Sequence, residues 1–378
     1  MKKNKITLRK ILVIIWVGIT VFVLCNCQPP QESELIRTQS LEQVLINKKT
    51  NLVLNNKKPN AYGKEHEIII FADSQLWQQS ESLLRQSLER VFFTTEDEAL
   101  FELIRVDISD FNNYFRYKNI IFLGLFNDDR PVSQQIQQLL AQDIISAAQT
   151  KESILLMNTN LWAKDQLILF LLGDTSSSIS EYLLNNPNNY FTIMKDRYLA
   201  RINHRLARLN QYAPNFFNNL PFTLNLPEIY KIYCQDLDNR FISFIFRNHW
   251  DQQKNPDRYL SVYWENCPEN ILTEQWFIDK RKELAWNYYD EDEFDLNDVS
   301  ISHDVWNTTD VLLLGGKYQN YKYYIGGAFQ SFAFYHPEVQ KIFIIDTVVY
   351  YPAGYKLSYL IELECIAQTI VLKKNNLL

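Results

Sequence analysis

The chain has 378 residues, of which 47% are hydrophobic and 14% aromatic, and its formal net charge is −6. A chain of this length and apolar content can bury a large core, and its length predicts about two domains. The acidic balance argues against nucleic acid and anionic lipid headgroups as partners, because like charges repel.

The N-terminus has the pattern of an export signal. Five basic residues and no acidic residue lie in the first ten positions, and an apolar segment follows over residues 11–25. A membrane span needs about 20 apolar residues, so this segment of about 15 predicts a cleaved signal peptide over residues 1–26. Its removal takes five basic residues from 38 and leaves 33 against 44 acidic ones, a balance of −11.

The apolar segment ends at Leu24-Cys25-Asn26-Cys27, which resembles a lipobox. We expect lipid attachment at Cys27, which would then begin the mature protein. Cys25 is a competing acceptor, and an uncleaved anchor is the third alternative. Several acyl chains, at about 0.8 kcal/mol per buried methylene group, would hold the protein on a membrane. We expect the cell envelope, at the outer membrane, with the folded body outside the cytoplasm.

Residues 27–65 are polar, with Pro29, Pro30 and many asparagines and lysines, and predict a flexible tether. Beyond it we expect two lobes, an N-terminal α/β lobe over residues 66–212 and a C-terminal α+β lobe over residues 213–378. The pattern of expected elements changes at Pro214, from alternating strands and helices to clustered strands.

In the first lobe, apolar segments predict strands, and apolar residues at helical spacing predict helices. The expected strands are 67–72, 101–108, 119–125, 153–158 and 166–172, and the last two form a hairpin. We expect three helices, one that begins after Asp73, one over 132–148 and one over 176–211 that is interrupted at Pro187. The last helix carries Arg197, Arg201, Arg205 and Arg208 on one side. We expect this stripe to face solvent, the alternative being contact with anionic lipid or a partner.

In the second lobe we expect a mostly antiparallel sheet covered by two helices. The expected strands are 222–226, 230–235, 241–247, 259–264, 311–314, 322–325, 329–335 and 341–349. The expected helices are 273–289 and 355–371. The fold class is therefore mixed, α/β in the first lobe and α+β in the second.

Several chemistries lack their usual sequence patterns. The nine glycines form no dinucleotide fingerprint, phosphate-binding loop or nucleophile elbow. The five histidines, at 66, 204, 249, 303 and 336, are never within four residues of one another, so no helical metal pair exists. The acidic run Asp290–Glu293 with Asp295 lacks the glycine and the distal glutamate of a calcium loop, and predicts a solvated loop. We predict no metal and no cofactor.

Three cysteines lie in the expected lobes, Cys234, Cys267 and Cys365. We expect three small, buried thiols. The alternative is a Cys234–Cys267 disulfide, because both residues lie on predicted neighbouring strands and an exported protein can form one.

Four short motifs resemble the bacterial lipoprotein family known as domain of unknown function 4837. They are Asp73-Ser74-Gln75-Leu76-Trp77, Leu161-Trp162-Ala163-Lys164-Asp165-Gln166, Gly326-Gly327-Ala328-Phe329-Gln330-Ser331 and Asp346-Thr347-Val348-Val349-Tyr350-Tyr351-Pro352. Ala328 stands where the family has a proline. The resemblance implies a cell-envelope lipoprotein with two α/β lobes and implies no activity.

The motif residues also have structural explanations. We expect Trp77 and Trp162 to be core anchors. We expect Gly326-Gly327 to form a turn that needs positive φ.

Two functions remain open at this point. The first is a non-catalytic protein, anchored by lipid, that binds an envelope protein or a small ligand. The alternative is a hydrolase of envelope polymers that uses paired carboxylates such as Asp279, Glu283 and Asp346. The lack of a catalytic motif favours the first.

Overall fold

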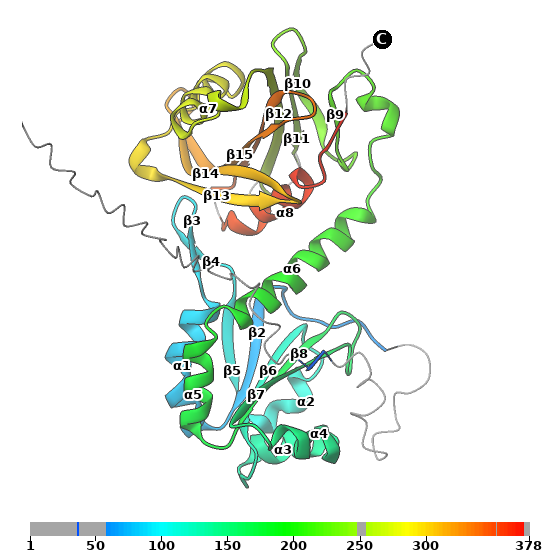
Figure 1. The fold of residues 1–378 in the computed structure, drawn as a ribbon, viewed down its shortest axis with the longest axis vertical. Helices are drawn as coiled ribbons and strands as arrows, with labels where there is room; N and C mark the ends of the chain where they lie inside the picture. Colours follow the sequence, from blue (N-terminus) through cyan, green and yellow to red (C-terminus); the bar gives the residue numbers. More distant parts are fainter. Residues whose placement is uncertain (1–35, 38–57, 248–254, 353, 374–378) are drawn as a thin grey trace, which may run out of the picture.

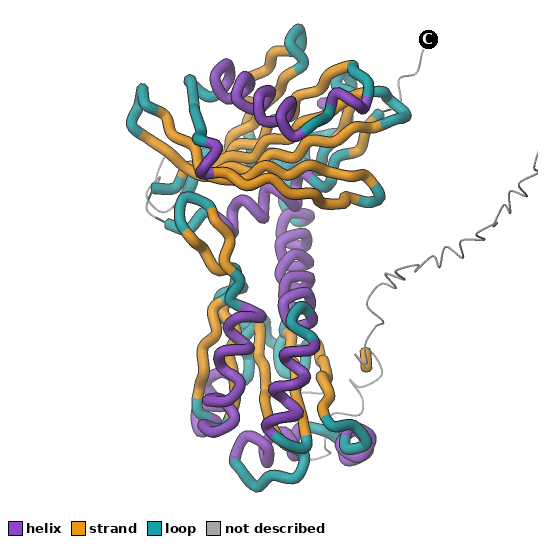
Figure 2. The backbone as a smooth tube through the Cα atoms, turned by 60° about the vertical axis from the view of Figure 1, so that its left-hand side comes forward, coloured by secondary structure: helices purple, strands orange, loops and turns teal. Residues whose placement is uncertain are grey.

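The computed structural model describes residues 36–37, 58–247, 255–352 and 354–373. They form two lobes, each built on its own β-sheet, and helix α6 (Asn189–Ala207) runs from the first lobe to the second (Figures 1 and 2). Among these residues no helix has the length and apolar character of a membrane span. The mixed α/β and α+β fold class is confirmed.

The first lobe contains a six-stranded mixed sheet in the order β1-β7-β8-β6-β2-β5. Strands β8, β6, β2 and β5 run parallel, and β7 forms the predicted antiparallel hairpin with β8. The strands are β1 (Ile36–Arg37), β2 (Glu67–Ala72), β5 (Glu102–Val106), β6 (Asn119–Leu125), β7 (Ser153–Thr159) and β8 (Leu167–Gly173).

Both faces of this sheet are buried, which explains why its strands are almost continuously apolar. Alternate residues of β2 enter two different cores: Ile68 and Ile70 one, Ile69 and Phe71 the other. The first core packs under α1 (Ser74–Leu88), α5 (Ser176–Asn185) and α6, and the second under α3 (Pro131–Leu139) and α4 (Gln142–Ala148). The short helix α2 (Phe111–Tyr114) lies beside the second core.

Two details of the first lobe differ from expectation. The helix expected over 132–148 is broken, because Leu140 and Ala141 are extended, with ψ of 144° and 148°. A hairpin of β3 (Val91–Phe93) and β4 (Asp97–Ala99) was not predicted. Trp77 is buried and Trp162 packs on the second core, as expected of core anchors.

The second lobe is a seven-stranded antiparallel sheet in the order β10-β11-β12-β16-β15-β14-β13. Helix α7 (Glu274–Tyr288) packs on one face and α8 (Leu357–Ala367) on the other. The strands are β10 (Lys231–Asp236), β11 (Phe241–Phe246), β12 (Asp257–Asn266), β13 (Val299–Trp306), β14 (Thr309–Asn320), β15 (Ile325–His336) and β16 (Lys341–Tyr350).

Some predicted strands of the second lobe are wrong. Of the strand expected over 322–325, residues 322–324 form the turn between β14 and β15, and only Ile325 lies in a strand. Strand β13 was not predicted. The strand expected over 222–226 is reduced to β9 (Phe222–Thr223), paired with β17 (Val371–Leu372). Short 3₁₀ helices lie at Ile108–Asp110, Pro214–Phe217, Glu269–Ile271 and Leu296–Asp298.

The three cysteines in the described residues are free. Cys234 lies on β10 opposite Ser243, so strand β11 separates it from β12, beyond which Cys267 lies. The alternative of a Cys234–Cys267 disulfide is therefore wrong. Cys365 is buried, whereas Cys234 and Cys267 are only half-buried.

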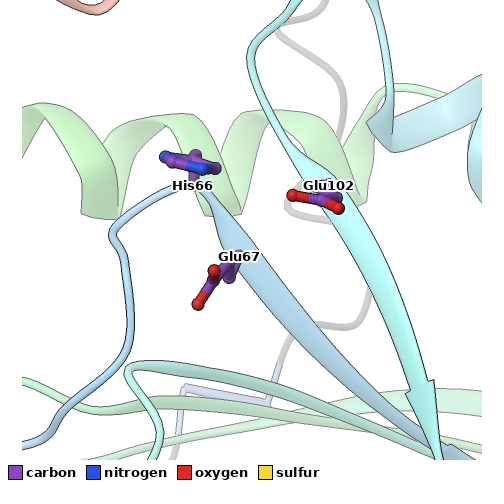
Figure 3. Close-up of side chains that lie close together, drawn as sticks. All are labelled: His66, Glu67 and Glu102. Carbon is purple, nitrogen blue, oxygen red and sulfur yellow. The ribbon is translucent and has the colours of Figure 1, made fainter.

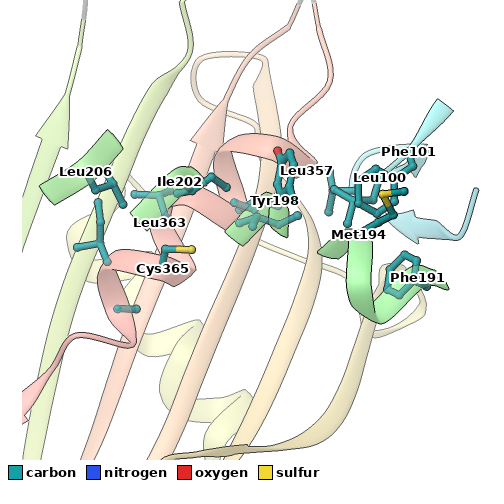
Figure 4. Close-up of a cluster of buried hydrophobic side chains, with 14 of the residues drawn as sticks. Leu100, Phe101, Phe191, Met194, Tyr198, Ile202, Leu206, Leu357, Leu363 and Cys365 are labelled. Carbon is teal, nitrogen blue, oxygen red and sulfur yellow. The ribbon is translucent and has the colours of Figure 1, made fainter. Parts of the chain in front are cut away.

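Helix α6 joins the lobes by packing against α8 (Figure 4). Met194, Tyr198 and Ile202 of α6 lie in the same buried cluster as Leu363 and Cys365 of α8. That cluster reaches the inner faces of both sheets, so one continuous core joins the two lobes.

The arginine stripe of α6 faces solvent only in part, since Arg205 and Arg208 are exposed, as expected, whereas Arg201 is buried. Arg201 is only 5% exposed, and its guanidinium donates to Asn119 Oδ1 at 2.8 Å and to Asp165 Oδ1 at 3.1 Å. Arg205 pairs with Glu65 and with Glu362 of α8, both at 3.1 Å, and so links the two lobes. Arg201 is thus held in a buried polar network, and Arg205 bridges the lobes from an exposed position.

A second link between the lobes comes from the β3–β4 hairpin. The buried carboxylate of Glu98 accepts hydrogen bonds from the backbone N–H groups of Lys356, at 2.8 Å, and Leu357, at 2.7 Å, where α8 begins. The Thr94 hydroxyl donates to the same carboxylate at 2.6 Å. An acidic side chain from the first lobe therefore caps a helix of the second.

Replacing Glu98 by Ala should lower the free energy of unfolding by about 2 kcal/mol, because it leaves buried N–H donors of α8 without acceptors. Chemical denaturation measures the change. The matched control is Glu96→Ala, since Glu96 is exposed on the same hairpin. Equal destabilisation by the two changes would contradict the assigned cap.

Candidate functional site

A cavity of about 260 Å³ lies in the second lobe, beside the C-terminal end of α7. Six tyrosines, three acidic residues and one arginine contribute to its lining. The lining residues are Tyr233, Arg247, Asp257, Tyr259, Tyr289, Asp290, Asp292, Tyr318, Asn320, Tyr323, Ile325, Val348 and Tyr350. We call it the tyrosine cavity. Its volume is slightly below the range of about 300 to 1,000 Å³ that is usual for small-molecule sites.

The strand register brings these side chains together. Tyr259 of β12 lies directly opposite Val348 of β16, and Asp257 opposite Tyr350. Residues two apart on a strand face the same side of the sheet, so these four share one face. Tyr259 and Val348 belong to, or pack on, the core beneath α7.

Gly327 makes room for one of the tyrosines. It was expected in a turn of positive φ, but it lies inside β15, directly opposite Tyr318 on β14. A Cβ atom at this position would lie 2.8 Å from Cε1 of the Tyr318 ring and 2.2 Å from the carbonyl oxygen of Val349. The glycine of the motif is therefore needed for close packing, not for a turn.

An ion pair with an unused acceptor lies at the cavity. Asp257 is 5% exposed, and its Oδ2 accepts from Arg247 Nε at 2.8 Å. Another nitrogen of Arg247 donates to the Tyr259 hydroxyl at 2.8 Å. The other carboxylate oxygen of Asp257, Oδ1, is buried and has no hydrogen-bond partner. Burying such an acceptor without a partner is costly, so a donor placed beside it would stabilise the fold.

The second carboxylate comes from the acidic run after α7. Asp290, Glu291, Glu293 and Asp295 are exposed, as expected of a solvated loop, but Asp292 is buried, and its Oδ1 accepts from Asn320 Nδ2 at 2.8 Å. The same amide donates to the backbone carbonyl of Asp290. Burial raises the pKa of Asp292 to about 6.

The three carboxylates of the hydrolase hypothesis do not line this cavity. Asp279 and Glu283 are exposed on α7, where Asp279 accepts from Gln275 and Glu283 pairs with Lys280.

Asp346 is instead fully buried beneath α7, 3.4 Å from the guanidinium of Arg281, and Ser331 donates to it. The Arg281 guanidinium also lies 3.7 Å from the centre of the Phe329 ring. This pair packs within the core, so Asp346 has a structural role.

A second cavity, of about 560 Å³, lies between the lobes and includes residues of the β3–β4 hairpin, α6 and the start of α8. His66 and Glu102 contribute to its wall, and with Glu67 they place three ligand atoms within 4.8 Å of one another (Figure 3). Glu67 and Glu102 are direct partners on β2 and β5, and the Glu102 N–H donates to the His66 carbonyl at 3.0 Å.

This trio could hold a divalent cation, because burial lowers the pKa of His66 and keeps its imidazole neutral at pH 7. However, the Lys64 ammonium already pairs with Glu67 at 2.9 Å, and a metal would have to displace it. The tyrosine cavity, with its unused buried acceptor, is therefore the stronger candidate. Sequence spacing missed both groups, since their members come from separate strands.

Comparison with known families divides the chain at the same point as its two sheets. Residues 61–207 match the model of the domain of unknown function DUF8532. Residues 210–369 match that of DUF4837. The DUF4837 match therefore covers the second lobe. The expected resemblance is thus confirmed there, whereas the first lobe matches a different family model. No curated protein matches the chain.

Three solved structures resemble part of the chain. A protein of Bacteroides thetaiotaomicron VPI-5482 has 15% identity and a TM-score of 0.24, and the match covers 41% of this chain and 46% of that one, less than half its length. Cyanobacterial PsbP (CyanoP) of Synechocystis sp. PCC 6803 has 8% identity and a TM-score of 0.28, over 41% and 88%. LpqN, involved in cell envelope biogenesis of Mycobacterium tuberculosis, has 10% sequence identity and a TM-score of 0.25, and the match covers 40% of this chain and 83% of that one.

The raised pKa of Asp292 predicts a pH dependence of stability. At pH 7 the buried, ionised carboxylate of Asp292 destabilises the fold, and this cost falls progressively towards pH 4, because the folded protein takes up a proton near pH 6 whereas the unfolded chain does so only near pH 3.8. Asp292→Asn removes the cost of a buried charge. It should raise the free energy of unfolding at pH 7 by up to about 3 kcal/mol. It should also make this free energy depend less on pH between pH 4 and 7.

Denaturant unfolding across this pH range measures the effect. Asp279→Asn, an exposed position on α7, is the matched control and should leave the slope unchanged. An unaltered slope in Asp292→Asn would contradict the raised pKa.

Proposed function

We propose that this chain is an exported, lipid-anchored protein of the cell envelope that binds a small polar ligand in the tyrosine cavity and performs no catalysis. The single observation that carries the ligand-binding proposal is the buried Oδ1 of Asp257, an acceptor without a partner at a cavity lined by six tyrosines. Binding pockets combine aromatic walls with a few well-placed polar groups, which is the composition seen here.

The envelope location rests on the N-terminal sequence. The charged start, the short apolar segment and the lipobox-like ending at Cys27 all lie outside the described residues. Residues 27–35 and 38–57 of the expected tether also lie outside them. The rest of the tether prediction is wrong, because Ile36–Arg37 pair with β7 and Asn60 and Tyr62 form bridges to Lys164 and Tyr117 of the first lobe.

Replacing Cys27 by Ala should abolish lipid labelling and release the protein from the membrane fraction. Metabolic labelling with an alkyne fatty acid, followed by fractionation, measures both. Cys25→Ala is the matched control and should label normally. Labelling that persists in Cys27→Ala would identify Cys25 as the acceptor. Membrane retention of an unlabelled wild-type protein would instead indicate an uncleaved anchor.

The ligand-binding proposal is tested by thermal unfolding of the purified protein in the presence of sugars, amines and amino acids. At least one class should raise the midpoint of the wild type, because a ligand that binds only the folded state stabilises it. Tyr323→Ala removes part of the cavity wall and should reduce the shift, whereas Tyr321→Ala, an exposed tyrosine of the same turn outside the lining, should not. Equal shifts in the two variants would contradict this site.

A further inference from the structure

We infer that the tyrosine cavity takes a small molecule through a primary ammonium group, held between the carboxylates of Asp257 and Asp292. This inference rests on the proposed function and adds the chemical class of the ligand. Three features of the cavity lead to it: its charge balance, its unused hydrogen-bond acceptor and its aromatic walls.

The charge balance of the lining favours a cation. Asp257, Asp290 and Asp292 contribute three carboxylates, and Arg247 is the one basic residue among the lining residues. The Arg247 guanidinium already bonds Asp257 and the Tyr259 hydroxyl, so it is occupied and offers little to an anionic ligand. A positive group in the cavity would offset the excess of negative charge.

The hydrogen-bonding groups favour a donor that also carries charge. Asp257 Oδ1 is buried without a partner, and Asp292 uses Oδ1 to accept from Asn320. A primary ammonium has three N–H donors, so it can serve both carboxylates at once. Charge-assisted bonds of this kind are about twice as strong as neutral ones. A quaternary ammonium would leave the buried acceptor unsatisfied.

The aromatic walls fit the rest of such a ligand. The tyrosine rings supply faces that attract a cation and apolar surface for the alkyl chain attached to it. Tyr318 is buried against Gly327, whereas Tyr323 is 52% exposed in the turn between β14 and β15. Tyr318 therefore forms an inner wall, and Tyr323 stands where a ligand would enter from solvent.

The test is isothermal calorimetry of the intact exported protein at pH 7 with n-butylamine, which presents one primary ammonium on a short chain. 1-Butanol, of nearly the same size and shape but neutral, is the matched ligand, and glucose represents neutral sugars. We expect the amine to bind and 1-butanol and glucose to give no heat at equal concentration.

Two isosteric variants assign the contact. Asp292→Asn keeps an oxygen for Asn320 and removes the charge, and should weaken amine binding by about tenfold or more, the loss expected for a hydrogen bond to a charged group. Asp257→Asn should do the same. Should the loss of the Arg247 pair unfold that variant, Asp292→Asn alone still decides. Asp279→Asn should bind as the wild type does.

The outcomes separate this inference from the proposed function. Binding of 1-butanol as tight as that of the amine, or amine binding unchanged in Asp292→Asn, overturns the ammonium assignment. Binding of glucose but not the amine, with loss in Tyr323→Ala, overturns the assignment but leaves the tyrosine cavity as the ligand site. If neither the amine nor any ligand class in the thermal screen responds to Tyr323→Ala, both fail.

Discussion

The packing of α6 against α8 is the contact on which the arrangement of the two lobes depends. Each sheet could fold around its own helices, since α1 and α5 cover one and α7 the other. α6 and α8 meet within the buried cluster that reaches both sheets. The ion pairs of Arg205 with Glu65 and Glu362 surround this contact, and they are exposed enough for salt to screen them. The apolar packing therefore carries most of the stability of the junction.

The tyrosine cavity lies on the α7 side of the second sheet, whereas α8 packs on the other face. Its polar groups are held by other parts of the same lobe: Asn320 fixes Asp292, and Arg247 fixes Asp257. Beneath them, Arg281 and Asp346 form a buried pair that ties α7 to β16. Such a pair contributes little net stability but defines one arrangement of the helix on the sheet. The cavity is thus built partly by strands of the sheet, which carry Tyr259 and Tyr318, and partly by the loop after α7, which carries Asp292.

How far the sequence predicts this molecule depends on the range of the interactions. Local signals were sufficient for the β7–β8 hairpin, for α7 and for the interruption of the long helix at Pro187. They failed where a residue distant in the sequence decides the environment of a side chain. Arg201 has the pattern of a surface residue, but the fold brings Asp165 and Asn119 to it. Gly327 has the pattern of a turn residue, but the fold places Tyr318 opposite it. The cavity was missed for the same reason, because its tyrosines follow the alternation of ordinary strand residues and its carboxylates come from separate segments.

The cap on α8 has a mechanical consequence. Glu98 holds the first turn of α8, while Leu363 and Cys365 farther along that helix pack on α6, so both links between the lobes end on one helix of 11 residues. At 1.5 Å per residue the helix is about 16 Å long. A change that displaced α8 would therefore disturb the helix cap and the packing on α6 together, and with them both contacts that hold the lobes.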